Sequence, residues 1–275
     1  MVLSSFQLNH AVELSEDGKT LYASSADAVY AWPYDAGAGT LGGDRKTLVQ
    51  GMRNNDHVSR TLLLSRKSKS TLLVSRGSAE NLDMETQDVK SGRSQIRAFD
   101  INNLPDGKPY SYTDGKVIGW GLRNSVGVAE HPITGGIFSV ENSADNIRRG
   151  GTDVHQDNPG EELNFHGFLN GSTESQGGNY GYPDCFALWA TDLPEGGSLK
   201  VGSQFSLDPG SDLNDEKCAK DYVAPRLTFQ AHTAPLDIVF TPDGSEAYVS
   251  FHGSCEFSYA LDSWQPVLTL RTREP

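Results

Sequence analysis

Basic residues and long apolar runs are scarce in this sequence. Its 275 residues include 23 Lys and Arg against 36 Asp and Glu, a formal charge of −13 at pH 7. Nucleic acid and anionic membrane surfaces repel such a chain, so neither is an expected partner. No apolar run approaches the roughly 18 residues that a membrane span needs. The first residues also lack the basic start and continuous apolar stretch of a signal peptide.

Cysteine is equally rare. The three cysteines, Cys185, Cys218 and Cys255, form no Cys-x-x-Cys motif and have no zinc-site spacing. Cys185 and Cys218 lie in polar, loop-like sequence and could pair in an oxidising compartment, whereas unpaired thiols of a cytosolic protein fit the sequence as well. The sequon Asn170-Gly171-Ser172 fits a secreted chain, although such triplets are common by chance.

Helical periodicity is weak, and short apolar runs separated by turn residues recur instead. A unit of strand, tight turn and strand occurs four times, at 12–24, 62–75, 126–140 and 238–250. The intervals between equivalent positions are 50, 64 and 112 residues, and the last corresponds to two units of 56. The positions are Leu14, Leu64, Val128 and Phe240. A period of about 50–60 residues predicts an all-β propeller with about five blades. A β-sandwich is the alternative, and the missing helical periodicity excludes a helical solenoid.

Polar clusters flank these predicted strands at equivalent places. Propellers carry function on the loops at one end of the central channel. We therefore expect the clusters to share one face of the molecule. They lie at 53–57, 76–81, 121–124, 141–145, 232–235 and 252–254.

Three segments in this order resemble the soluble quinoprotein glucose/sorbosone dehydrogenases: Gly-Leu-Arg-Asn at 121–124, Glu-Glu-Leu-Asn at 161–164 and Gly-Gly-Asn-Tyr-Gly-Tyr-Pro at 177–183. Tyr-Pro-Asp-Cys-Phe at 182–186 and His-Thr-Ala-Pro at 232–235 are most similar to the fungal secreted branch, the pyranose or L-sorbosone dehydrogenases that depend on pyrroloquinoline quinone (PQQ). The resemblance covers roughly residues 10 to 254.

The resemblance implies a six-bladed β-propeller that binds PQQ and Ca²⁺ in the channel mouth. We expect the propeller domain at 1–254 and a divergent tail at 255–275. The family pattern His-Gly-Ser-Trp-Asn-Arg is replaced here by His-Gly-Ser-Cys-Glu-Phe at 252–257, so late basic residues that normally hold PQQ carboxylates are missing. These departures predict an incomplete, truncated propeller.

The resemblance also assigns roles to individual residues. It makes His57 the catalytic base, because a neutral imidazole suits that role near pH 7. The predicted cofactor-binding residues are Arg123, Asn124, Arg76, His232 and Glu141. At the positions that correspond to 141–143 here, bacterial relatives have Gln-Gly-Pro and bind Ca²⁺. By this resemblance, Asn142 and Ser143 are the predicted metal ligands.

Two further segments leave alternatives open. Glu162 and Tyr180 match a structural Ca²⁺ site of bacterial relatives, but Glu161-Glu162 reads more simply as a solvated acidic turn. Asp153, His155 and Asp157 have a metal-ligand spacing within sequence that otherwise predicts a polar loop.

The implied activity is oxidation of a pyranose, aldose or 2-keto-aldose sugar, by hydride transfer from the anomeric carbon to PQQ with Ca²⁺ as Lewis acid. An external acceptor, such as a cytochrome domain or an oxidase, would take the electrons, and the family is extracellular. Two alternatives remain: a non-catalytic propeller remnant that acts as a binding scaffold, and a Ca²⁺-dependent lactonase-like hydrolase.

Overall fold

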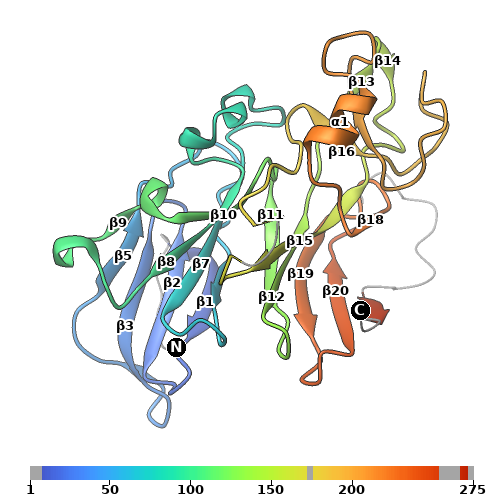
Figure 1. The fold of residues 1–275 in the computed structure, drawn as a ribbon. Coiled ribbons are helices and arrows are strands. Elements are labelled where there is room, and N and C mark those ends of the chain that lie inside the picture. The colour runs from blue at the N-terminus through green and yellow to red at the C-terminus, as the bar shows by residue number, and fades with distance from the viewer. Residues whose placement is uncertain (1–7, 172–175, 254–266, 272–275) are drawn as a thin grey trace.

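The computed structural model describes residues 8–171, 176–253 and 267–271. Most of their strands form four mainly antiparallel sheets that stand side by side, with a loop-rich region above them (Figure 1). No helix among the described residues is long and apolar enough to cross a membrane.

The first two sheets come from the N-terminal 120 residues. The first has the order β1-β2-β3-β5, with β4 beside β3 and β9 parallel to β5. Its strands are β1 (Leu8–Leu14), β2 (Thr20–Ser25), β3 (Val29–Asp35), β4 (Thr40–Leu41), β5 (Lys46–Gln50) and β9 (Tyr110–Ser111). The second has the order β10-β8-β7-β6. Its strands are β6 (Leu62–Leu64), β7 (Thr71–Arg76), β8 (Gln95–Asp100) and β10 (Lys116–Trp120).

The other two sheets follow. The third has the order β11-β12-β15-β18, and the fourth has the order β19-β20-β21. Their strands are β11 (Ser125–Glu130), β12 (Gly136–Glu141), β15 (Glu161–Phe168), β18 (Leu227–Phe229), β19 (Pro235–Phe240), β20 (Glu246–Phe251) and β21 (Val267–Arg271). β21 lies within the segment predicted as a divergent tail, and Cys255 lies outside the described residues.

Short elements fill the loops above the sheets. Four 3₁₀ turns span Met84–Gln87, Val89–Ser91, Pro105–Gly107 and Tyr112–Asp114. The remaining elements are β13 (Arg148–Arg149), β14 (Thr152–Asp153), β16 (Cys185–Ala187), β17 (Gln204–Ser206) and the helix α1 (Asp215–Asp221). A disulfide between Cys185 and Cys218 joins β16 to α1, which settles the pairing that the sequence left open.

The four predicted hairpins are confirmed as the strand pairs β1–β2, β6–β7, β11–β12 and β19–β20. The first strands of successive sheets contact one another, as the inner strands of propeller blades do. A Cβ on Gly127 in β11 would lie 2.6 Å from Asp237 Cα in β19, so glycine permits this close approach.

The expected count of about five blades is wrong for the described residues, which form four. The 112-residue interval from Val128 to Phe240 is not two blades. It is one blade that carries a long insertion between β15 and β18, including β16, β17 and α1. A hairpin spacing cannot distinguish a missing repeat from an insertion.

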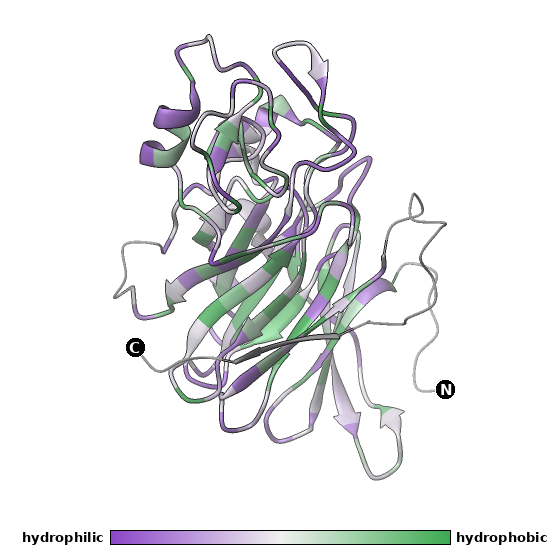
Figure 2. Ribbon diagram, turned by 90° about the vertical axis from the view of Figure 1, so that its right-hand side faces the viewer, coloured by the Kyte–Doolittle hydropathy of each residue, from purple (hydrophilic) through white to green (hydrophobic). Residues whose placement is uncertain are grey.

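Apolar side chains fill the spaces between neighbouring sheets. Adjacent residues of a strand point to opposite faces, so Leu72 packs toward the first sheet and Leu73 toward the third. Val140 and Ile238 belong to a further cluster between the third and fourth sheets. Figure 2 shows this pattern as apolar strands beneath predominantly polar loops. The sheets thus form a packed platform that fixes the loop ends.

Candidate active site

The predicted site residues lie on loops or strand ends at one end of the sheets. His57 precedes β6, Arg76 ends β7, Arg123 and Asn124 precede β11, Glu141 ends β12, and His232 precedes β19. This is the convergence that the polar clusters predicted. Main-chain bonds join neighbouring loops, since Ser78 N donates to Arg123 O at 2.8 Å and Asn142 N to Asn124 O at 3.0 Å.

His57 is held in one tautomer. Its Nδ1 lies 2.8 Å from Ser78 Oγ and 3.2 Å from the Ser78 carbonyl oxygen. Ser78 Oγ donates its own hydrogen to Glu80 O at 2.7 Å, so it can only accept from the ring. Nδ1 therefore carries the proton, and Nε2 keeps its lone pair. Burial, and secondarily the charge of Arg123, lowers the pKa of His57, so the ring is neutral near pH 7.

Gly77 brings His57 and Asn124 together. A Cβ at this position would lie 2.6 Å from Asn124 Oδ1 and 2.7 Å from His57 Cβ, closer than real contacts allow. Only glycine lets both side chains lie against the end of β7. Gly77 lies in the polar cluster at 76–81, but no sequence pattern indicated this packing role.

Arg123 joins several loops and is 5% exposed. Its guanidinium donates to Asn81 O at 3.1 Å, Asn81 Oδ1 at 2.8 Å and Asn142 O at 3.3 Å. Asp145 Oδ2 lies 3.5 Å from Nη2. The arginine is thus a rigid cation positioned between the loops that follow β7 and β12.

Arg76 has a different environment. Its guanidinium donates to Asn54 Oδ1 at 3.0 Å, Arg53 O at 3.1 Å and Gly92 O at 3.4 Å. Asn54 in turn donates to Gly77 O at 2.7 Å. The structure therefore directs the Arg76 guanidinium into the loops that support His57, and its predicted contact with the cofactor stays a prediction.

Glu141 also points into the protein and is 4% exposed. Its Oε1 accepts from Arg123 N at 2.6 Å, and its Oε2 accepts from Asn164 Nδ2 at 3.3 Å. Burial, and then the neighbouring Glu162, raises the pKa of Glu141. These two internal contacts fix the carboxyl group of Glu141, and its predicted role in cofactor binding stays a prediction.

The prediction of a solvated acidic turn at Glu161 and Glu162 is wrong, because both side chains are buried on β15. Burial raises the pKa of each to about 7. Glu161 accepts from Ser143 N at 2.6 Å and Ala234 N at 3.2 Å. This carboxyl group therefore fixes the loop after β12 to the loop before β19.

The predicted metal ligands lie on that fixed loop. Asn142 Nδ2 donates to Pro235 O at 2.6 Å, and Asn142 O accepts from Arg123. Ser143 is held through its main-chain nitrogen by Glu161. The two residues are thus positioned by the arginine and by the buried carboxyl group.

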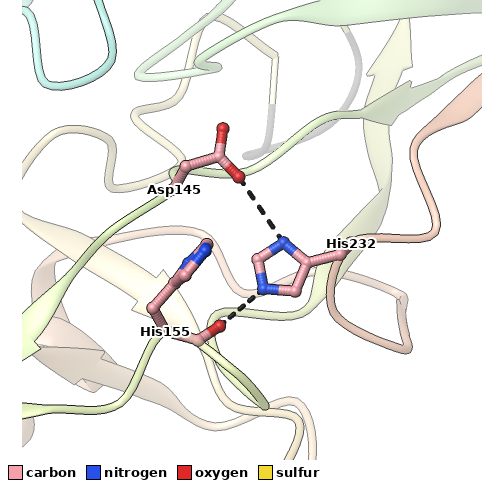
Figure 3. A group of neighbouring side chains, drawn as sticks. All are labelled: Asp145, His155 and His232. Atoms are coloured by element: carbon pink, nitrogen blue, oxygen red, sulfur yellow. Dashed lines mark hydrogen bonds and ion pairs between the residues drawn. The ribbon is translucent and has the colours of Figure 1, made fainter. Parts of the chain in front are cut away.

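Asp145, His155 and His232 meet (Figure 3), and Asp145 also faces Arg123. His232 Nδ1 lies 3.5 Å from Asp145 Oδ1, and His232 Nε2 lies 2.5 Å from His155 O. The hydrogen bond with Asp145 raises the pKa of His232 to about 9, so this ring is cationic at neutral pH. Asp153 Oδ1 accepts from His155 N at 3.1 Å, and the Asp-x-His-x-Asp spacing does not gather into one ligand set.

A pocket of about 600 Å³ opens beside this group. It is lined by residues 152–158 and 192–194, including His155 and three aspartates. The insertion within the third blade supplies part of its wall, which no sequence motif had indicated.

Comparison with known proteins identifies the family of this chain. The family model described as TrAA12-like matches residues 1–261. This chain is a member of the TrAA12-like family. It is 54% identical over 253 residues to a pyrroloquinoline quinone-dependent sugar dehydrogenase of Hypocrea jecorina (strain QM6a), covering 90% of this chain and 59% of that protein.

Other relatives agree. A PQQ-dependent pyranose dehydrogenase of Coprinopsis cinerea is 37% identical over 264 residues, covering 92% of this chain and 35% of the relative. This TrAA12-like chain thus spans about three fifths or less of the curated relatives it matches.

Solved structures show the same fold. The calcium structure of the Trichoderma reesei AA12 enzyme has a TM-score of 0.90 at 50% identity, covering 98% of this chain and 67% of that one. The holo PQQ domain of the Coprinopsis cinerea pyranose dehydrogenase has a TM-score of 0.86 at 36% identity, covering 92% and 62%. A glucose dehydrogenase at 16% identity, with a TM-score of 0.58, supports the propeller-type fold alone.

Proposed function

We propose that this chain carries the base and part of the cofactor pocket of a PQQ-dependent sugar dehydrogenase. The observation that carries the proposal is the His57–Ser78 arrangement, which directs the ring proton inward and leaves Nε2 as a basic lone pair. The names of the relatives supply the sugar and the quinone.

PQQ, when bound, supplies a quinone carbonyl carbon that accepts a hydride. In our proposal His57 Nε2 takes the proton of the anomeric hydroxyl as the anomeric carbon loses that hydride. Gly77 and Ser78 hold the ring, so the base needs no carboxylate partner. Asn124, packed against the same glycine, lies where it can orient a polar group of the substrate or the quinone.

The cationic groups fit a polycarboxylate cofactor. PQQ carries three carboxylates, which need positively charged donors. Arg123 and the protonated His232 stand on either side of Asp145, each 3.5 Å from one of its oxygens. These two side chains are the residues that would hold cofactor carboxylates in this part of the pocket.

Buried oxygens fit a hard cation such as Ca²⁺. Among the described residues, Asn164 Oδ1 is buried without a hydrogen-bond partner, while its Nδ2 donates to Glu141 and Glu162. These three residues, with Asn142 and Ser143 on the adjoining loop, are the candidate oxygen donors for Ca²⁺.

The proposal also covers the location of the protein and its partners. The Cys185–Cys218 disulfide supports an extracellular location, because such bonds persist in oxidising compartments. We propose an external electron acceptor, such as a cytochrome domain or an oxidase, and no nucleic-acid or membrane partner, in line with the charge of −13.

The test is a titration of the purified chain with PQQ in Ca²⁺, followed by L-fucose, D-glucosone or sorbosone and a redox dye. We expect saturable quinone absorbance, and dye reduction that falls by about 100-fold or more in His57→Gln. The control is His131→Asn, in the β11–β12 turn at the opposite end of the sheets. Binding without turnover would contradict the catalytic proposal and favour a binding scaffold, and a folded chain that binds no PQQ would contradict both parts.

A further inference from the structure

Beyond the dehydrogenase activity, we propose that Asp145, His155 and His232 form a site for one divalent transition-metal ion such as Zn²⁺. One ligand atom from each side chain lies within 4.8 Å of the other two (Figure 3). Two imidazoles and one carboxylate are the ligands that Zn²⁺ and related ions select, whereas Ca²⁺ prefers oxygen alone.

One edge of the coordination polyhedron already has the required length. Zinc bonds of roughly 2.0–2.1 Å in a tetrahedron separate neighbouring ligand atoms by about 3.3 Å. Asp145 Oδ1 and His232 Nδ1 are 3.5 Å apart. Because all three ligand atoms lie within 4.8 Å of one another, His155 needs only a small movement to complete the set.

Neighbouring groups orient two of the ligands. His232 Nε2 donates to His155 O at 2.5 Å, which leaves Nδ1 facing Asp145. Asn81 holds the Asp145 main chain twice, through Asp145 N at 2.9 Å and Asp145 O at 2.6 Å. Such outer contacts fix the orientation of metal ligands in established sites.

His155 is the adjustable member. Its ring stands edge-on to His232 with centroids 4.3 Å apart, and its Nδ1 accepts from Asn146 N at 2.8 Å. An ion that binds this ring must replace that hydrogen bond, and it must also displace the proton shared by His232 and Asp145. The affinity should therefore lie below that of closed structural zinc sites and should rise with pH.

Of the three side chains, His155 lines the neighbouring pocket. Its volume of about 600 Å³ admits a hydrated ion and leaves room for water ligands. The second oxygen of Asp145 faces Arg123 at 3.5 Å. An ion on Asp145 would weaken that ion pair, so metal binding and the arrangement of Arg123 are energetically linked. Because zinc binds the neutral ring, metal binding and the proposed contact of protonated His232 with a PQQ carboxylate exclude each other.

Calorimetric titration with Zn²⁺, in excess Ca²⁺ and without PQQ, tests the site. Calcium fills carboxylate-only sites, so the remaining signal reports imidazole ligands. We expect one equivalent of Zn²⁺, and Co²⁺ should give the intense visible absorption of a four-coordinate nitrogen-containing site.

The variants His155→Ala and Asp145→Asn should each weaken Zn²⁺ binding by at least about tenfold. His131→Asn, which also removes one imidazole, should leave the affinity unchanged. Near-UV circular dichroism verifies that each variant is folded. Equal affinity in His155→Ala and the unmodified chain would overturn the proposal, as would absence of saturable binding by the folded unmodified chain.

Discussion

Gly77→Ala tests how the fold positions His57, the proposed base. The new methyl group would lie 2.6 Å from Asn124 Oδ1 and 2.7 Å from His57 Cβ, whereas ordinary contacts are 3.4–4 Å. One or both side chains must therefore move by about 0.7 Å or more. Overpacking of this kind costs roughly 1–3 kcal/mol, which corresponds to a fall in Tm of about 2–10 °C.

The expected effect on activity is larger than the effect on stability. A displacement of about 1 Å at a reacting group can cost roughly 100-fold in rate, so dye reduction by the PQQ-loaded chain should fall by about that factor. Thermal unfolding and dye-reduction kinetics are measured on the same preparations. Gly42→Ala is the matched control, because the nearest atom to its new Cβ would be Pro33 Cβ at 3.9 Å. If Gly77→Ala matched Gly42→Ala in both Tm and rate, the positioning argument would be refuted.

Three further predictions follow from the charges. Since burial raises the pKa of Glu161 from 4.5 to about 7, the folded state holds this proton more tightly, and stability in EDTA should fall by up to roughly 3 kcal/mol as the pH rises from 4.5 to about 7. Glu161→Gln should flatten that fall in urea denaturation, and an unchanged slope would contradict the assignment. The lowered pKa of His57 should place the acid limb of kcat/KM below pH 6.5, and a limb above that value would argue against His57 as the base. Asp215→Ala removes both carboxylate oxygens that accept 2.7 Å bonds from the buried Arg149, so it should lower stability by about 3 kcal/mol and expose the loops around α1 to proteolysis. Wild-type resistance would show that the pair contributes little.

Sequence alone determined the features that depend on local pattern and residue type. The four hairpins follow from apolar runs around tight turns, and the ordered motifs at 121–124, 161–164 and 177–183 pointed to the correct family. The placement of His57, Arg123, Asn124 and His232 at one end follows from their positions beside equivalent strands.

Tertiary structure decided the matters that depend on which segments meet. The direction of Arg76, the burial of Glu161 and the grouping of Asp145 with His155 and His232 all involve loops far apart in the chain. The role of Gly77 depends on two side chains arriving from other loops. Local sequence sets strands and turns, but only packing of the blades determines which charge is buried, which tautomer is held and which loop faces another.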